Sequence, residues 1–161
     1  MKKPVATSSG QFDEVIRIIQ ISHDRALKAV NAEMIRMYWN VGEYLSKLCA
    51  NANFGDKIID DVAAYIAQNN PGAKGFNRRG LYRMKQFYEL YKDDEFVSPL
   101  VTQVSWTNHL LIMSGSKSVD ERHFYLSLCA KEHYSKRELE RQMDSGYYER
   151  SMLSSKKLPS Q

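Results

Sequence analysis

The stretch QFDEVIRIIQISHDRALKAVNAEMIRMYWNVGEYLSKLC, residues 11–49, decides the fold class. It contains no proline and a single glycine, Gly42. Apolar side chains recur along it at the spacing of one face of an α-helix. They are Phe12, Val15, Ile19, Ala26, Ala29 or Val30, Met34, Met37, Val41, Tyr44 and Leu48. The pattern predicts one very long helix or two stacked ones, with other helices or a second copy of the chain to cover the apolar face.

Helical signals continue beyond this stretch. Residues 51–55 interrupt the pattern, and helices are expected over residues 56–69 and 78–91, joined by a turn rich in glycine. Two later segments begin with the serine and glutamate of a capping box, at Ser118 with Glu121 and at Ser135 with Glu138. Further helix starts are expected at Asn77 and at Ser105 or Thr107.

Strand signals are weak, because the best candidate, residues 97–104, is interrupted by Pro99. The predicted fold class is therefore all-α, a multi-helix domain with a long N-terminal helix and a helix-turn-helix-like unit over residues 56–91. A length of 161 residues suits one domain with a core of its own. We expect that domain over residues 11–150, with flexible tails at residues 1–10 and 151–161.

Composition excludes several classes of protein. With 43% hydrophobic and 26% charged residues, the chain resembles a folded protein more than a disordered one. No apolar run reaches the roughly 18 residues of a membrane span, and the N-terminus lacks the apolar core of a signal peptide. Cys49 and Cys129 are isolated, so we expect two buried free thiols, no zinc site and a cytoplasmic location.

Positive charge is concentrated in one part of the chain. The net charge is +4, yet residues 71–92 contain six lysines and arginines and one acid, a local charge of about +5. Leu81, Met84, Tyr88 and Tyr91 follow the spacing of a buried stripe on the helix expected there. Its other side is basic and polar, and arginine can bind a phosphate or a guanine edge through two N–H groups. The nucleic-acid-binding residues predicted from this pattern are Lys74, Arg78, Arg79, Tyr82, Arg83 and Lys85.

Two other interpretations of the basic helix stay open, a solvated surface and a surface for an acidic protein partner. The long first helix indicates a different alternative function. It carries more apolar surface than a small domain easily covers, which is typical of a protein-interaction or dimerisation module. In that case the partner is a second copy, bound through the long N-terminal helix, without nucleic acid.

The sequence gives little indication of a catalytic site. The acid pairs at residues 60–61 and 93–95 are not followed by a lysine at the spacing of a two-carboxylate nuclease site. Asp120, Glu121 and His123 imitate metal ligands, but Glu121 is better explained as the partner of the Ser118 cap. We therefore predict no catalytic residue, no metal ligand and no cofactor, and we do not expect this chain to be an enzyme.

Seven ordered segments resemble the N-terminal domain of the YhcG family. Residues 38–42, YWNVG, resemble its YWxIG segment, and residues 75–88, GFNRRGLYRMKQFY, resemble its GFSxxNLxxMRxFY core. Two departures stand out: Gly80 replaces the usual asparagine before Leu81, and Asn108 replaces the first of two histidines. The other matching segments are residues 54–55, 104–109, 121–125, 134–142 and 148–150.

The resemblance implies a bacterial protein whose helical domain is winged-helix-like or helix-turn-helix-like and precedes a PD-(D/E)XK nuclease domain. The 161 residues contain no such nuclease domain, so any nuclease activity is expected to belong to another domain. Together with the basic helix, the resemblance leads to the expected function, a DNA-binding module that targets a nuclease, with DNA as its partner.

Overall fold

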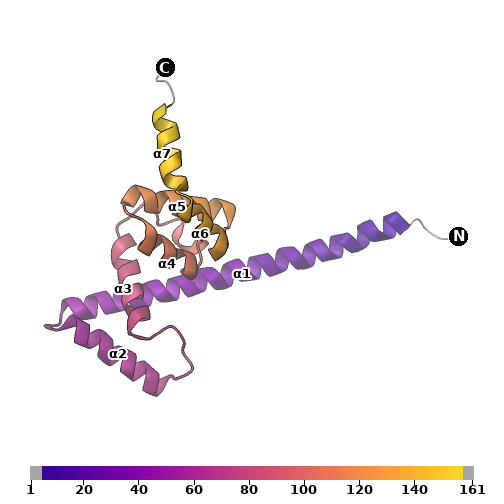
Figure 1. Cartoon of the computed structure of the whole chain (residues 1–161). Coiled ribbons are helices and arrows are strands. Elements are labelled where there is room, and N and C mark those ends of the chain that lie inside the picture. Colours follow the sequence, from indigo (N-terminus) through magenta and orange to yellow (C-terminus); the bar gives the residue numbers. More distant parts are fainter. Residues whose placement is uncertain (1–4, 158–161) are drawn as a thin grey trace.

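The computed structural model describes residues 5–157. These residues form seven α-helices and one short 3-10 helix (Figure 1). The bounds are α1 Val5–Ala50, α2 Gly55–Asn69, α3 Arg78–Tyr91, η1 Val101–Gln103, α4 Trp106–Gly115, α5 Val119–Glu132, α6 Lys136–Asp144 and α7 Tyr147–Lys157. The described part of the chain contains no strand, which confirms the all-α prediction and leaves the α2–α3 unit without a β wing.

A single uninterrupted helix, α1, forms the spine of the molecule. Of the two arrangements predicted, one long helix is correct. It begins at Val5, inside the segment for which we expected a tail, because residues 5–10 contain no proline and a single glycine. Likewise α7 extends to Lys157, beyond the predicted boundary at residue 150. Residues 1–4 and 158–161 of the predicted tails lie outside the described residues.

Side-chain caps set the starts of four helices. The side chains of Asn77, Ser105, Ser118 and Ser135 each accept a hydrogen bond from a backbone N–H three residues on. The capping box at Ser135 is complete, since the Glu138 carboxylate accepts from the Ser135 N–H. The box at Ser118 is not, because Glu121 accepts from the N–H of Lys117 instead.

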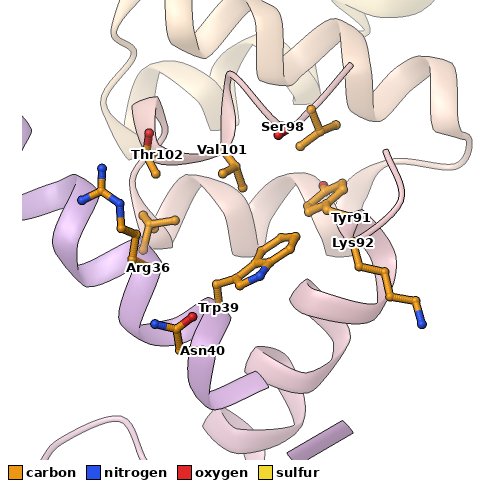
Figure 2. A pocket seen from close by; sticks show the side chains of 10 residues that line it. Arg36, Trp39, Asn40, Tyr91, Lys92, Ser98, Val101 and Thr102 are labelled. Atoms are coloured by element: carbon orange, nitrogen blue, oxygen red, sulfur yellow. The ribbon is translucent and has the colours of Figure 1, made fainter. Parts of the chain in front are cut away.

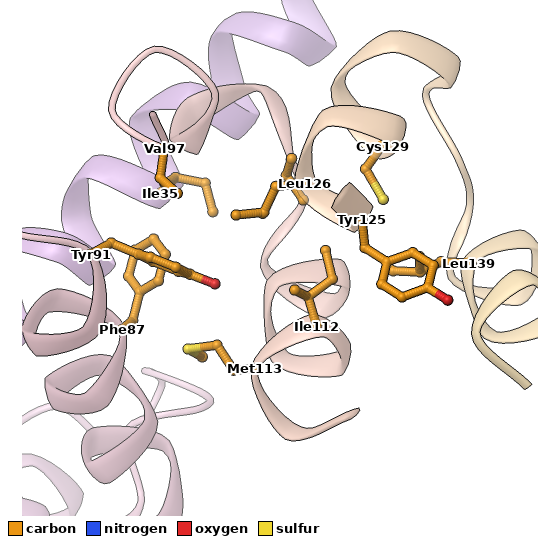
Figure 3. Close-up of a cluster of buried hydrophobic side chains, with 11 residues drawn as sticks. Ile35, Phe87, Tyr91, Val97, Ile112, Met113, Tyr125, Leu126, Cys129 and Leu139 are labelled. Carbon is orange, nitrogen blue, oxygen red and sulfur yellow. The ribbon is translucent and has the colours of Figure 1, made fainter. Parts of the chain in front are cut away.

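The larger core lies between α1, α3, α4, α5 and α6. Figure 3 shows its side chains pointing inward from these helices. Phe87 is fully buried, whereas the predicted stripe assigned that place to Tyr88. Tyr88 is only half-buried because its hydroxyl reaches the edge of α1 and donates to the Glu43 carboxylate at 3.3 Å.

A second, smaller core joins α1 to α2 and α3 through Leu45, Ile59, Leu81 and Met84. Here α1 and α3 approach closely at Gly42. A Cβ atom at this position would lie 2.7 Å from the Met84 carbonyl carbon. The glycine therefore permits the helix crossing that holds α3 in place.

Aromatic rings connect the two cores. Trp106 stacks on Tyr38, with ring centroids 4.3 Å apart, and Trp39 meets Phe87 edge-on at 5.5 Å. Both tryptophans are half-buried, as expected of side chains that pack within the fold. Within the described residues, no helix combines the length and apolarity needed to cross a bilayer.

Candidate nucleic-acid interface

A hollow of about 400 Å³ opens between the starts of α3, α4 and α6. We call it the basic groove, because three of the side chains that line it are cationic: Arg79, Arg83 and Lys136. Arg83 follows Arg79 at the i+4 position, so both lie on the same side of α3. The other lining residues are Gly75, Asn77, Gly80, Trp106, Thr107, Leu110, Leu111 and Ser114.

Three capped helix starts meet at this groove. α3 begins after Asn77, α4 after Ser105 and α6 after Ser135. The first-turn amides of an α-helix carry a partial positive charge and lack partners within the helix, so anions bind there readily. The hydroxyl of Thr107, in the first turn of α4, adds a hydrogen-bond donor to the lining.

The turn before α3 is shaped by two glycines. Gly75 has a positive φ of 85°, a conformation that favours glycine. A Cβ atom on Gly80 would lie 2.9 Å from the Gly75 carbonyl carbon, so the turn folds back directly onto the helix start. This contact explains why glycine suits position 80, where the YhcG pattern has asparagine.

Within residues 5–157, the two groove arginines have no acidic partner. Within the described residues, no carboxylate oxygen lies within 4.0 Å of either Arg79 or Arg83. Arg79 is exposed and Arg83 half-buried. Lys136 forms one long contact, 3.7 Å, with Glu140, and both side chains are well exposed. Such surface pairs are weak, so the charge of Lys136 stays available to an anion.

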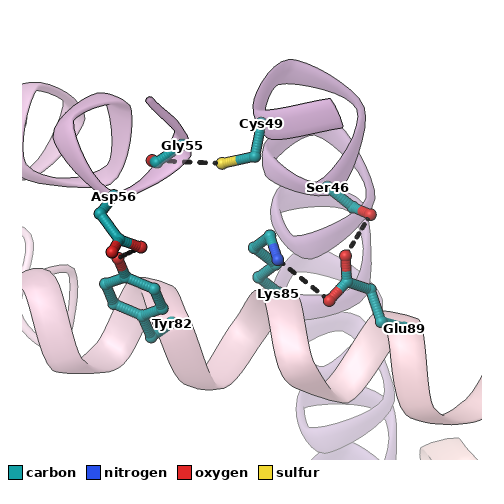
Figure 4. A network of polar contacts seen from close by, with 7 residues as sticks. All are labelled: Ser46, Cys49, Gly55, Asp56, Tyr82, Lys85 and Glu89. Carbon is teal, nitrogen blue, oxygen red and sulfur yellow. Dashed lines mark hydrogen bonds and ion pairs between the residues drawn. The ribbon is translucent and has the colours of Figure 1, made fainter. Parts of the chain in front are cut away.

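Arg78 and Tyr82 point elsewhere, although the sequence placed them in the same predicted site. The Arg78 Nε atom lies 2.5 Å from an oxygen of Asp60, and its guanidinium lies over the Tyr82 ring. The Tyr82 hydroxyl donates to Asp56 at 2.5 Å (Figure 4). The hydrogen bonds raise the pKa of Arg78 and of Tyr82 above their ordinary values. Both side chains therefore connect α3 to α2.

Lys85 is also held by an acid of this chain. Its Nζ atom lies 3.1 Å from Glu89, whose other oxygen accepts a hydrogen bond from Ser46 of α1 (Figure 4). Partial burial opposes ionisation of Glu89, but the hydrogen bonds from Ser46 and Lys85 outweigh it and lower the pKa of Glu89. Lys74 is exposed on the connection between α2 and α3.

Of the six predicted residues, the structure thus places Arg79 and Arg83 in the basic groove and turns Arg78, Tyr82 and Lys85 toward other partners. The sixth, Lys74, is exposed and is not among the residues that line the groove. Lys136 was missed, because it is far from residues 71–92 in sequence. A weak signal was present: Lys136 follows the capping serine of a predicted helix, so its backbone amide belongs to a positive helix end.

A second hollow, of about 330 Å³, lies between α1, the end of α3 and residues 97–102 (Figure 2). The ring of Trp39 faces it, while Arg36 and Lys92 extend away on opposite sides. None of its ten lining residues is an acid, a histidine or a cysteine. The lining therefore offers no carboxylate or imidazole for acid–base work.

The buried ionisable groups are suited to packing. Burial lowers the pKa of His109 to about 4, and its Nε2 atom lies 2.8 Å from the Val101 carbonyl oxygen. Burial raises the pKa of the Cys129 thiol to about 12. His123, considered above as a metal ligand, lies 2.6 Å from Asp94 and stacks on Phe96. No group of three or more potential metal ligands gathers within the described residues.

The fold and the groove define an all-helical module whose cationic surface is built at helix starts. The chain belongs to the family described as the DUF1016 N-terminal domain, whose sequence model matches residues 14–150. This is the N-terminal domain of the YhcG family, so the resemblance seen in the sequence is confirmed. No curated protein and no solved structure matches the chain. The family description names no activity, and the basic groove is the feature of this chain that indicates a function.

Proposed function

We propose that this domain binds DNA through the basic groove and serves to target a PD-(D/E)XK nuclease domain to its substrate. One observation carries the proposal: Arg79, Arg83 and Lys136, from two separate parts of the chain, line one hollow at three helix starts. Unpaired guanidinium groups beside helix N-termini suit the phosphates of a nucleic-acid backbone. The role assigned to this chain is binding, with no catalytic step.

Three of the residues that line the groove are cationic, and this number sets the expected salt dependence of DNA binding. Three phosphate contacts predict that log affinity falls with log salt at a slope of about −3. Raising salt from 50 to 200 mM should then weaken binding by roughly 50-fold. Phosphate contacts carry no sequence information, so we expect similar affinity for duplexes of different sequence.

Fluorescence anisotropy with a labelled DNA duplex at several salt concentrations tests this proposal. The variant Arg79→Glu/Arg83→Glu reverses both groove arginines and should abolish salt-dependent binding. The control Arg25→Glu/Lys57→Glu changes the net charge equally, at exposed positions of α1 and α2, and should bind more weakly by only a small factor. Equal losses in the two variants would show a diffuse charge effect, and the groove would then have no special role.

The alternative left open by the sequence, interaction with another protein chain, depends on a different surface. That surface is the exposed apolar side of α1, where Phe12 and Leu27 keep 66% and 68% of their side-chain surface in solvent. Large exposed apolar surfaces are typical of interaction sites. This function does not require the basic groove.

A further inference from the structure

A continuous apolar stripe runs along α1 from residue 12 to residue 37, and its spacing continues through Val41 and Leu45 into the smaller core. Its members are spaced by three or four residues, with His23 falling at the same spacing between Ile19 and Leu27. Each keeps between 37% and 68% of its surface exposed. We call this surface the α1 stripe; its residues are Phe12, Ile16, Ile19, Leu27, Val30, Met34 and Met37.

The opposite side of the same helix has a different character. Ile35 and Gly42 mark the side of α1 that is buried against the rest of the fold. Counting back from Ile35 by helical turns, this side continues through Lys28, Asp24 and Arg17, all of them charged and exposed. In the first half of α1, charged side chains therefore gather on this side and most large apolar side chains gather in the stripe, which is typical of a helix that pairs with one other helix.

The first half of α1 also projects from the body. Figure 1 shows it extending beyond the other helices of the described chain. The side-chain amide of Asn31 donates to the carbonyl oxygens of Thr102 and Val104, at 3.1 and 3.2 Å, where α1 reaches the rest of the fold. Asp24, Leu27 and Lys28 line a hollow together with residues of η1, α4 and α5, so the projecting part of α1 lies before Asp24.

The area of the stripe matches what a dimer needs. Seven large apolar side chains, each about half exposed, present on the order of 700 Å² to solvent. The largest apolar patches of monomeric proteins are roughly 300–600 Å², and each partner of a stable complex buries about 800 Å². With Val15 and Ala26 at its margins, the stripe reaches that size.

We propose that a second copy of this chain covers the stripe, with the two α1 helices antiparallel and overlapping over residues 5–37 of each copy. A two-fold axis near Ile21 would bring Phe12 of one copy to Val30 of the other, and Ile19 to His23. The same register opposes Ile16 to Ala26, so that larger side chains meet smaller ones, as packing between helices requires.

One feature favours the antiparallel direction over a parallel one. A parallel pair would place His23 against its own copy, whereas the antiparallel pair opposes it to Ile19. Because α1 begins at Val5, the antiparallel register also brings the partner helix along Met34 and Met37, so the whole stripe is included.

Sedimentation equilibrium of the full chain without nucleic acid tests the inference. The wild type should be a dimer at micromolar concentration. Ile19→Glu would bury a charge in the interface and should weaken association by roughly 100-fold or more. Ile18→Glu is the matched control: Ile18 is a neighbouring isoleucine, 54% exposed and turned away from the stripe, so this variant should remain a dimer.

Circular dichroism shows whether both variants keep their helix content, which separates lost association from lost folding. A monomeric wild type, or equal effects of Ile19→Glu and Ile18→Glu, would overturn the proposal. The inference stands apart from DNA binding, because a dimer can form whether or not the basic groove binds an anion.

Disulfide trapping tests the direction. In a Cys49→Ser background, we expect a mixture of Phe12→Cys and Val30→Cys chains to form mixed disulfides on mild oxidation. A disulfide needs Cα atoms within about 7 Å, which only the antiparallel register provides for this pair. Rapid cross-linking of Phe12→Cys chains to one another, with no mixed product, would refute that register.

Discussion

Toward the C-terminal end of α1, Gly42 lies directly against the backbone of α3, and its replacement by alanine has two opposing effects on stability. An alanine inside a helix is more stable than a glycine by roughly 0.5–1 kcal/mol, because glycine loses more freedom on folding. The new Cβ atom would, however, lie 2.7 Å from the Met84 carbonyl carbon and 3.1 Å from the Tyr88 Cβ atom. Real Cβ atoms essentially never come closer than 3.0 Å to another heavy atom.

The steric clash should outweigh the gain in helix propensity. The obstacle at Met84 is backbone, which cannot rotate away as a flexible side chain can, so α1 and α3 must separate. Overpacking of this kind costs typically 1–3 kcal/mol, and here the contact between the two central helices of the fold is affected. We therefore expect Gly42→Ala to lower the free energy of unfolding by about 1–2 kcal/mol after the helix-propensity gain is subtracted.

Urea unfolding followed by circular dichroism measures this difference as a shift of the midpoint at unchanged slope. Gly10→Ala is the control with the opposite sign: it lies in the same helix, and a Cβ atom there meets nothing within 4 Å. Its stability should be unchanged or higher by up to about 1 kcal/mol. If Gly42→Ala is as stable as the wild type, the close approach of α1 and α3 does not constrain the fold as argued.

Three further outcomes follow from the buried groups and the caps. Burial places the folded-state pKa of His109 at about 4, below its ordinary value of 6.5, so the unfolded chain binds the extra proton as pH falls through this window. Stability should therefore decline from pH 6.5 toward pH 4, by up to about 1.4 kcal/mol per pH unit, and His109→Gln should show a shallower decline in urea titrations. In native protein, iodoacetamide should modify the half-buried Cys49 well before Cys129, whose pKa is raised to about 12 by burial; mass spectrometry that finds equal labelling would contradict this. Asn77→Ala removes the acceptor for the Gly80 N–H and should cost about 1 kcal/mol in thermal unfolding, whereas Asn77→Ser should restore most of it.

Much of the fold could be predicted because its signals are local. Helix starts depend on a capping side chain and an amide three residues away, so Asn77, Ser105 and Ser135 could be identified without knowing the tertiary structure. The boundaries of α1 were harder. Residues 5–10 have no strong preference of their own, and the structure shows them continuing the helix that follows.

The candidate site was only partly predictable. Charge density along the chain identified α3 as basic, but density does not say where each side chain points. Arg78 and Arg79 are neighbours in sequence and lie about 100° apart around the helix, so one meets Asp60 of α2 and the other enters the basic groove.

By itself, the sequence determined the helical class, the caps, the family and the presence of excess positive charge, because each of these follows from residue identity and spacing over a few turns. Only the tertiary structure decided which cations stay free of acids and that Lys136 joins Arg79 and Arg83 across a distance of more than fifty residues. It also decided that the apolar stripe of α1 stays partly exposed among the described helices. The physical reason is that ion pairing and burial depend on which helices pack against each other, and that is a property of the folded chain rather than of any short segment.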